Sequence, residues 1–218
     1  MRLDHVFICC DVGAPEADAL RRIGFVEGSP NVHPGQGTAN RRFFFEVGFL
    51  ELLWVADPTE AQSAQTAPTR LWPRWLARDG GACPFGAVFA ASSDRGESPP
   101  FDAWDYRPSY LPAGRSLRFA VATTLSEPEL VYMPWQSPAR SSQPTRHAPP
   151  FSTLRAASFG IPSDAALSPS ALAARAAGLV DFYPSTLFEL TLELDAAREC
   201  RVDLRPTLSL ILIGKPER

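Results

Sequence analysis

Leu3-Asp4-His5-Val6-Phe7-Ile8 opens the most informative quarter of the chain, and Phe49-Leu50-Glu51-Leu52-Leu53-Trp54 closes it. Both runs have the apolar character of largely buried β-strands, and each carries one metal-capable side chain, His5 and Glu51. Between them lies a turn-rich loop with many polar side chains, His33-Pro34-Gly35-Gln36-Gly37-Thr38-Ala39-Asn40. A histidine on one strand and a glutamate on a later strand can converge on a small-molecule or metal site. This pair carries most of what the sequence indicates about function.

The order of elements in this quarter predicts a β-α-β-β-β unit. Pro15 suits the first turn of a helix, and Gly24 suits its end. Residues 46–49 have the composition of a tight hairpin. We therefore expect five elements in order: a strand over 3–9, a helix over 14–23, a short strand at 25–26, and strands over 42–47 and 49–55.

Similar spacing recurs further along the chain, which predicts repeated units. Phe85-Gly86-Ala87-Val88-Phe89-Ala90 corresponds to the first strand, and Glu129-Leu130-Val131-Tyr132-Met133 corresponds to the last. Glu51 follows His5 by 46 residues, and Glu129 follows Phe85 by 44. The second unit has weak support for its helix, because residues 94–100 have a loop-like composition. A strand over 153–161 and an Ala-rich helix over 168–179 begin a third unit.

These units divide the chain into five segments. We expect a first βαβββ module over 1–57, a helical connector over 58–81, a degenerate second module over 82–136, a Pro- and Ser-rich loop over 137–150, and a third, βαβββ-like module over 151–218. The length of 218 residues is enough to bury a sizeable core.

Composition excludes several classes of function. A net charge of −3 and a pI of about 5.7 leave no broad cationic field, so we expect no nucleic-acid partner. No apolar run reaches the roughly 18 residues that span a bilayer, so no membrane partner is expected. The N-terminus lacks the pattern of a secretory signal, which favours a cytoplasmic location. The four cysteines have no zinc-finger spacing.

The motifs of the first quarter resemble the glyoxalase-like branch of the vicinal oxygen chelate superfamily. The resemblance rests on Leu3-Asp4-His5-Val6, on His33-Pro34-Gly35-x-Gly37-Thr38-x-Asn40 and on Leu50-Glu51-Leu52, with a weaker match in Pro134-Trp135 followed by His147 and Pro149. It weakens in the middle of the chain, and over the last third it rests on the order of elements. It implies an α+β fold in which repeated βαβββ modules pack as one domain. Their strands would form an open, curved, mixed β-sheet barrel with flanking helices and a site in its concavity.

The resemblance also implies a divalent metal ion (Zn, Fe, Mn or Ni) held by the first and last strands of each module. Mapped onto this chain, the candidate ligands are His5, Glu51 and Glu129. The first strand of the second module departs from the pattern, because it offers Phe85 or Gly86 in place of a ligand. A complete set of four ligands is therefore absent from the sequence.

Two kinds of chemistry remain open for these residues. A bound metal would leave positions for the oxygens of a substrate and would stabilise an oxyanion. Without a metal, Glu51 could act as a general base, which makes it the candidate catalytic residue. The structural alternatives are a hydrogen-bonded strand histidine at His5 and a solvated strand-end carboxylate at Glu129.

The loop before Asn40 is a candidate substrate-binding segment. Gly35 and Gly37 permit positive φ and a close approach of backbone N–H groups to an anion or carbonyl. His33, Thr38 and Asn40 add polar side chains at the start of a strand. The alternative is a structural turn whose side chains satisfy the local backbone.

Three further residues are candidates for the wall of a substrate pocket. Trp54 and Trp135 lie at or just beyond strands that carry site candidates. His147 belongs to the weaker part of the resemblance. For each tryptophan, packing in the core is the alternative.

We therefore expect a glyoxalase-like protein, monomeric or homodimeric, that binds a small oxygen-bearing molecule. One reading is a metal-dependent lyase, isomerase or dioxygenase. The alternative is a metal-free ligand-binding protein of the resistance type, which sequesters its ligand in an aromatic pocket. A degenerate structural domain is a third possibility, because fold alone does not decide among them.

Overall fold

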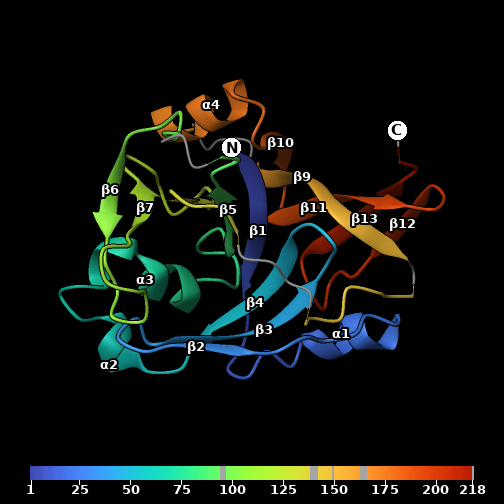
Figure 1. The fold of residues 1–218 in the computed structure, drawn as a ribbon, viewed down its shortest axis with the longest axis horizontal. Helices are drawn as coiled ribbons and strands as arrows, with labels where there is room; N and C mark the ends of the chain where they lie inside the picture. Colours follow the sequence, from blue (N-terminus) through green and yellow to red (C-terminus); the bar gives the residue numbers. More distant parts are fainter. Residues whose placement is uncertain (94–96, 138–141, 149, 163–165, 218) are drawn as a thin grey trace.

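The computed structural model describes residues 1–93, 97–137, 142–148, 150–162 and 166–217. Their backbone forms an eight-stranded sheet that curls into a half-barrel, a five-stranded sheet beside it, and a few short helices (Figure 1). This arrangement confirms the predicted α+β class with a curved, mixed sheet. Within these ranges, no helix is both long and apolar enough to cross a membrane.

The first module supplies half of the large sheet. Its elements are β1 (Arg2–Cys9), α1 (Ala17–Arg22), β2 (Asn31–His33), β3 (Thr38–Phe44) and β4 (Phe49–Val55). The strands lie in the order β2-β3-β4-β1, and β1 pairs with β4 in parallel. The first and last strands of the module are therefore neighbours, which brings His5 and Glu51 close together.

The connector is helical, as the sequence predicts. It contains α2 (Pro58–Ala61), a 3₁₀ turn η1 (Ala67–Thr69) and α3 (Leu71–Leu76). Asp57 caps α2, because its carboxylate accepts hydrogen bonds from the backbone N–H groups of Thr59 and Glu60.

The second module repeats the strand order of the first. It consists of β5 (Phe85–Ala90), β6 (Ala103–Tyr106), β7 (Leu117–Ala120) and β8 (Glu129–Met133). Its order is β5-β8-β7-β6, with β5 parallel to β8, and antiparallel pairing of β1 with β5 joins the two modules. Between β5 and β6 the described residues form no helix, and residues 94–96 of the predicted loop lie outside them.

The third unit forms the five-stranded sheet. Its elements are β9 (Phe151–Pro162), α4 (Pro169–Ala176), β10 (Asp181–Ser185), β11 (Glu189–Ala196), β12 (Cys200–Asp203) and β13 (Leu210–Lys215). The order β10-β9-β11-β13-β12 departs from the other modules, because β9 lies between β10 and β11 and has no pairing with a final strand. Ser168, the first residue of the helix predicted over 168–179, caps α4, since its hydroxyl accepts from the N–H of Ala171.

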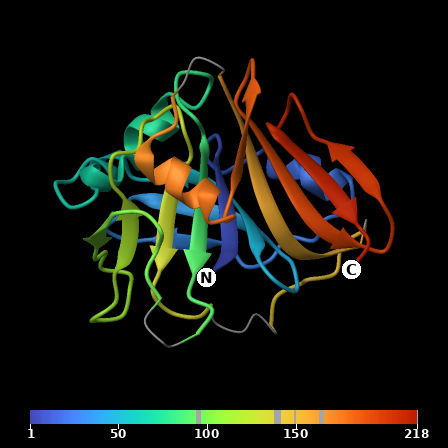
Figure 2. The same ribbon diagram turned by 90° about the horizontal axis from the view of Figure 1, so that it is seen from above.

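The main core lies between the two sheets, which stand side by side when viewed from above (Figure 2). Alternation along the strands sends Val6 of β1 and Leu50 and Leu52 of β4 into this core, where Leu190 and Leu192 of β11 meet them. Each such side chain contributes about 1.5–3 kcal/mol on full burial. The opposite face of β1 and β4 is left for the concave side of the half-barrel.

Three boundaries in the first module differ from the sequence prediction. The helix begins at Ala17, because Ala14 has a positive φ of 44° and lies in the preceding turn. No strand forms at 25–26, and the edge strand is instead β2. The strand predicted over 42–47 is β3, which begins earlier and ends at Phe44.

Candidate functional site

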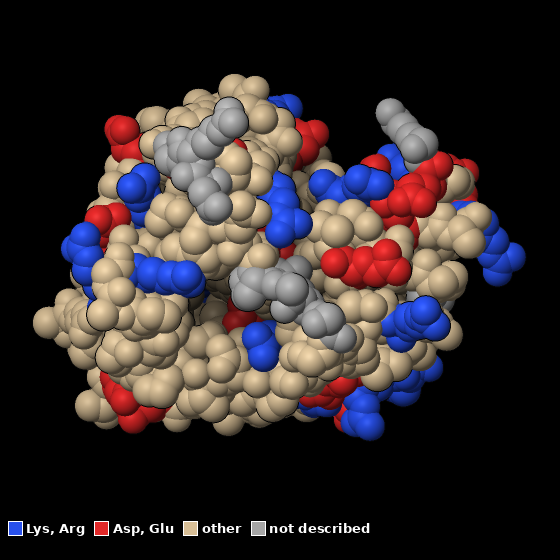
Figure 3. Space-filling view, in the orientation of Figure 1, with Lys and Arg blue, Asp and Glu red and all other residues tan. Residues whose placement is uncertain are grey.

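A cavity of about 490 Å³ opens on the concave face of the large sheet. The space-filling view shows a hollow on this side of the molecule, with an acidic side chain visible in it and Lys or Arg side chains on both flanks (Figure 3). Both modules supply apolar and aromatic wall residues, among them Phe7, Phe44, Phe49, Phe119, Val131 and Trp135. The volume lies within the usual range for small-molecule sites, roughly 300–1,000 Å³.

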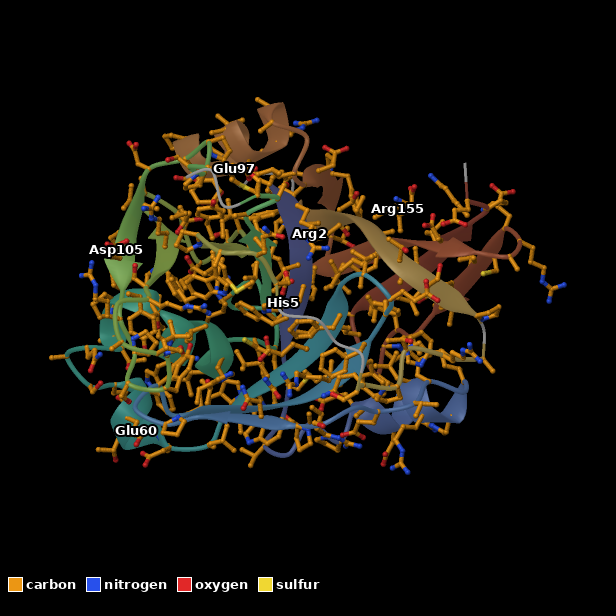
Figure 4. The ribbon with its side chains drawn as sticks, viewed as in Figure 1. Arg2, His5, Glu60, Glu97, Asp105 and Arg155 are labelled. Atoms are coloured by element: carbon orange, nitrogen blue, oxygen red, sulfur yellow. The ribbon has the colours of Figure 1, made fainter. Side chains whose placement is uncertain are left out.

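The polar part of the cavity lies on the first module. Alternation along β4 directs Glu51 into the cavity together with Phe49. A bulge in the pairing of β1 with β5 between Leu3 and His5 interrupts the alternation, so Asp4 and His5 both line the cavity. His5 lies on β1 near the centre of the molecule (Figure 4).

These side chains form one hydrogen-bonded group, which we call the His5 cluster: Asp4, His5, Asn40 and Glu51. His5 Nδ1 lies 2.7 Å from Asp4 Oδ2, and His5 Nε2 lies 3.4 Å from Glu51 Oε2. Asn40 Nδ2 donates to Glu51 Oε1 at 2.5 Å. The imidazole stacks on the ring of Phe49, with centroids 4.1 Å apart. The cluster is therefore held on several sides before any ligand arrives.

The charges of the cluster reinforce one another. Burial lowers the pKa of His5, but hydrogen bonds and charge from Asp4 and Glu51 outweigh it and raise that pKa above the usual value. Burial raises the pKa of Glu51, but the hydrogen bond and charge of His5, with help from His33 and Asn40, lower it to about 2. Glu51 is ionised at neutral pH, and two carboxylates flank one imidazole.

A second polar group lies beside the first. His33 Nδ1 lies 2.9 Å from Thr38 Oγ1, which also accepts from Gln36 Nε2 at 2.7 Å. Tyr110, from the connection between β6 and β7, donates its hydroxyl to Gln36 Oε1 at 3.0 Å. Burial lowers the pKa of His33 and raises the pKa of Tyr110. Of the predicted residues, His33 lines the cavity, whereas Thr38 supports it from behind.

Two arginines lie at the border of the cavity. Arg42 Nε donates to the carbonyl oxygen of Ser29 at 2.8 Å, and its guanidinium lies 5.0 Å from the centroid of Phe44. The guanidinium of Arg115 lies 5.0 Å from the centroid of Trp135, which the sequence predicted as a wall residue.

The glycines of the predicted loop serve the turn and not the cavity. The backbone N–H groups of Gly35 and Gly37 donate to Glu60 Oε2 at 2.7 and 3.1 Å. Both have positive φ, and a Cβ on Gly37 would lie 2.3 Å from the carbonyl oxygen of Asp57. Glu60 belongs to α2 and lies at the edge of the molecule (Figure 4). Both backbone N–H groups are therefore engaged by Glu60, and the substrate-binding role of the two glycines stays a prediction.

Two other predicted pocket residues also lie outside the cavity lining. Leu53 lines the cavity, and Trp54 is the next residue along the strand, so alternation turns Trp54 towards the main core. His147 accepts from the N–H of Val26 through Nδ1 at 3.1 Å, and its Nε2 lies 2.8 Å from the carbonyl oxygen of Phe44. With both ring nitrogens engaged by backbone, His147 joins a distant segment to the first module. Pro149 of the same motif lies outside the described residues.

Glu129, the third predicted metal ligand, is an ion-pair partner. Its Oε2 lies 3.2 Å from both Arg70 Nη2 and Arg74 Nη2. Arg74 is fully buried and also donates to the carbonyl oxygens of Cys83 and Glu127. The register of β4, β1, β5 and β8 places Glu129 three strand spacings from Glu51, roughly 14 Å along the sheet.

The donor set does not fit the metal site that the fold family implies. His5 and Glu51 are close enough to share an ion, but catalytic zinc sites normally use three protein ligands. In the part of the chain that the structure describes, no group of three or more His, Cys, Asp or Glu side chains is arranged to hold a metal. Phe7 covers the place on β5 where the second module would offer a ligand, because a Cβ on Gly86 would lie 2.2 Å from its ring.

Two joined modules with the same strand order, the first of them βαβββ, and a cavity on their concave face place this protein in the class of the vicinal oxygen chelate superfamily. Its family follows from sequence: a glyoxalase-like domain matches residues 3–123, more than half of the chain, so the chain belongs to that family. A hypothetical protein from Staphylococcus aureus has a similar fold, with a TM-score of 0.54 and 10% sequence identity over 99% of each chain. No curated protein matches the sequence.

Proposed function

We propose that this protein is a metal-free binding protein for a small organic molecule, held in the cavity of the large sheet. The observation that carries the proposal is the cavity itself, in which the His5 cluster faces aromatic and aliphatic walls. Few, convergent polar groups in an otherwise apolar hollow are typical of small-molecule sites.

The two kinds of surface suggest what the ligand contains. The rings of Phe44, Phe49 and Phe119 suit an aromatic or other flat apolar body. Glu51 is buried and ionised, and a carboxylate can accept more hydrogen bonds than those of His5 and Asn40. We infer that the ligand presents a hydroxyl or N–H group to Glu51.

Binding fits this geometry better than acid–base catalysis. A general base works best when its pKa lies near the working pH, whereas the pKa of Glu51 is about 2. The catalytic role of Glu51 stays a prediction. The metal-dependent reaction also stays a prediction, and for it the cavity supplies two ligands, His5 and Glu51. Asp4 and Asn40 are explained as groups that fix the orientation of His5 and Glu51.

A fluorescent titration tests the proposal. Tolylnaphthylamine is a neutral probe with an aromatic body and one N–H group. We expect one probe per chain, with affinity unchanged by EDTA or added zinc. Leu117→Trp, which fills the cavity, and Glu51→Gln, which removes the charged acceptor, should each weaken binding by about tenfold. Glu193→Gln removes a carboxylate that pairs with Lys215 on the small sheet, so it serves as the control and should bind normally.

Thermal melting of each variant shows whether it is folded. The proposal would be contradicted if both Leu117→Trp and Glu51→Gln kept the wild-type melting temperature and also bound the probe with wild-type affinity. The metal-dependent reading has its own test: metal analysis of protein purified without chelator, repeated on His5→Ala and Glu51→Ala. We expect the wild type and both variants to contain equally little metal. One metal ion per chain in the wild type, lost in both variants, would favour the metalloenzyme.

A further inference from the structure

We propose that the ligand of the cavity is an organic anion, and that Arg115 binds its acidic group at the mouth. This inference rests on the proposed function, because it concerns the same cavity. It adds a charge to the ligand and a second attachment point, in the second module, whereas Glu51 belongs to the first.

Arg115 is exposed, yet it lines the cavity and stacks on Trp135 at 5.0 Å. Among the described residues, no carboxylate lies within ion-pair distance of it, and its recorded side-chain contact is the tryptophan ring. Arg107, in the same connection between β6 and β7, instead pairs with Asp105 at 2.8 Å. Within the described part of the chain, Arg115 is therefore a positive charge without a counter-ion, held by a stacked ring at the opening of the cavity.

Guanidinium groups suit this task for a chemical reason. They offer a planar fork of N–H donors that matches a carboxylate or another oxyanion, and stacking on an aromatic ring leaves that fork available. The stacked ring also limits the rotamers of the arginine, so less entropy is lost when a ligand binds.

The two carboxylates of the cavity lie on the first module, whereas Arg115 lies in the second. Asp4 and Glu51 place two carboxylates around one imidazole at the inner wall. Arg42 is the register partner of Glu51 across β3 and β4 and belongs to the same module, and its Nε and Nη2 donate to the carbonyl oxygens of Ser29 and Pro30. A molecule with a donor at one end and an acid at the other matches both modules, whereas the reversed orientation would oppose like charges.

A matched pair of probes tests the inference. Toluidinonaphthalene sulfonate carries its N–H and its sulfonate at opposite ends of a naphthalene ring, and tolylnaphthylamine is the same molecule without the sulfonate. We expect the wild type to bind the sulfonate about tenfold more tightly than the neutral probe. Arg115→Gln should bring the two affinities to near parity, and Arg115→Glu should reverse the preference.

The control is Arg107→Gln, which removes the same charge from the same connection away from the cavity and should keep the preference. Affinity for the neutral probe should be similar in all four proteins, since Arg115 makes no contact with a neutral end group. Equal binding of both probes by the wild type, or a preference that survives in Arg115→Gln, would overturn the inference and leave the proposed function standing. Failure of the neutral probe to bind in the cavity would instead overturn the proposed function.

Discussion

The two halves of the large sheet share one strand order and differ in the side chains that they turn towards the cavity. The first module presents the His5 cluster. The second presents Val88, Val131 and Met133, while its carboxylate, Glu129, is neutralised by Arg70 and Arg74. The repeat of the backbone is therefore not a repeat of the chemistry. The strands of one half turn a polar cluster towards the cavity, and the strands of the other turn apolar side chains towards it.

The difference has a physical origin in what surrounds each carboxylate. Glu51 is satisfied by an amide and an imidazole that leave it facing the cavity. Glu129 forms an ion pair with the fully buried guanidinium of Arg74, so its charge is neutralised within the protein. A residue of the same type at the same place in the module thus faces the cavity in one half and forms ion pairs within the protein in the other.

The largest expected effect comes from breaking the ion pair in the second half. Arg74→Leu leaves Glu129 buried with Arg70 as its remaining cation, and removal of one partner of a buried pair costs about 3–5 kcal/mol. Urea denaturation of wild type and variant measures the loss. Glu193→Gln, on the small sheet, should lose less than about 1 kcal/mol. A similarly small loss in Arg74→Leu would show that Glu129 is not held as described.

The second largest effect is expected from giving the second module a histidine that faces the cavity, as His5 of the first module does. Val88 is the register partner of His5 across β1 and β5 and lines the same cavity. Val88→His would add a third donor beside His5 and Glu51, which completes the usual ligand count for zinc. We expect zinc affinity to rise by at least about a hundredfold over wild type, measured by competition with a chromogenic chelator. Wild-type protein that already binds zinc as tightly as Val88→His would refute the comparison.

A smaller effect is expected in the pH dependence of the first half. Because the pKa of His5 is raised above 6.5, its contribution to stability is complete below that pH and is lost as pH rises through the raised pKa. The pKa of Glu51 falls from 4.5 to about 2, so its contribution is complete above 4.5 and is lost as pH falls towards 2.

The free energy of unfolding should therefore show a plateau between these two limits. In Glu51→Gln the plateau should fall by about 1–2 kcal/mol, and the NMR titration midpoint of His5 should move down. An unchanged midpoint in this variant would mean that Glu51 and His5 are not coupled.

Much of the fold was predictable because long apolar runs make buried strands. β1, β4, β5 and β8 were all expected, and all lie in the middle of the large sheet. The edge strand β2 was missed because its single apolar residue, Val32, is exposed and gives no periodic signal. β10 was missed for a similar reason, since it contains Pro184 and continues almost directly into the next strand.

The residues that line the cavity were predictable where they lie on regular strands. Side chains alternate between the two faces of a strand, so if Glu51 faces the cavity, Trp54 faces the opposite side. The sequence therefore already indicated that Trp54 is not a wall residue of the cavity. Asp4 was not predictable, because a bulge in the pairing with β5 brings it to the cavity. Tyr110 and Arg115 come from a connection without periodicity, and their positions depend on tertiary contacts.

The central claim is that the first half of the large sheet binds the polar end of a small molecule without a metal. An NMR titration of isotope-labelled protein with tolylnaphthylamine in EDTA tests it most directly. The largest shifts should fall on the backbone and side chains of His5, Asn40 and Glu51, with little change at His147 or at the amides of Gly35 and Gly37. No binding in EDTA, or shifts centred on the small sheet, would contradict the claim.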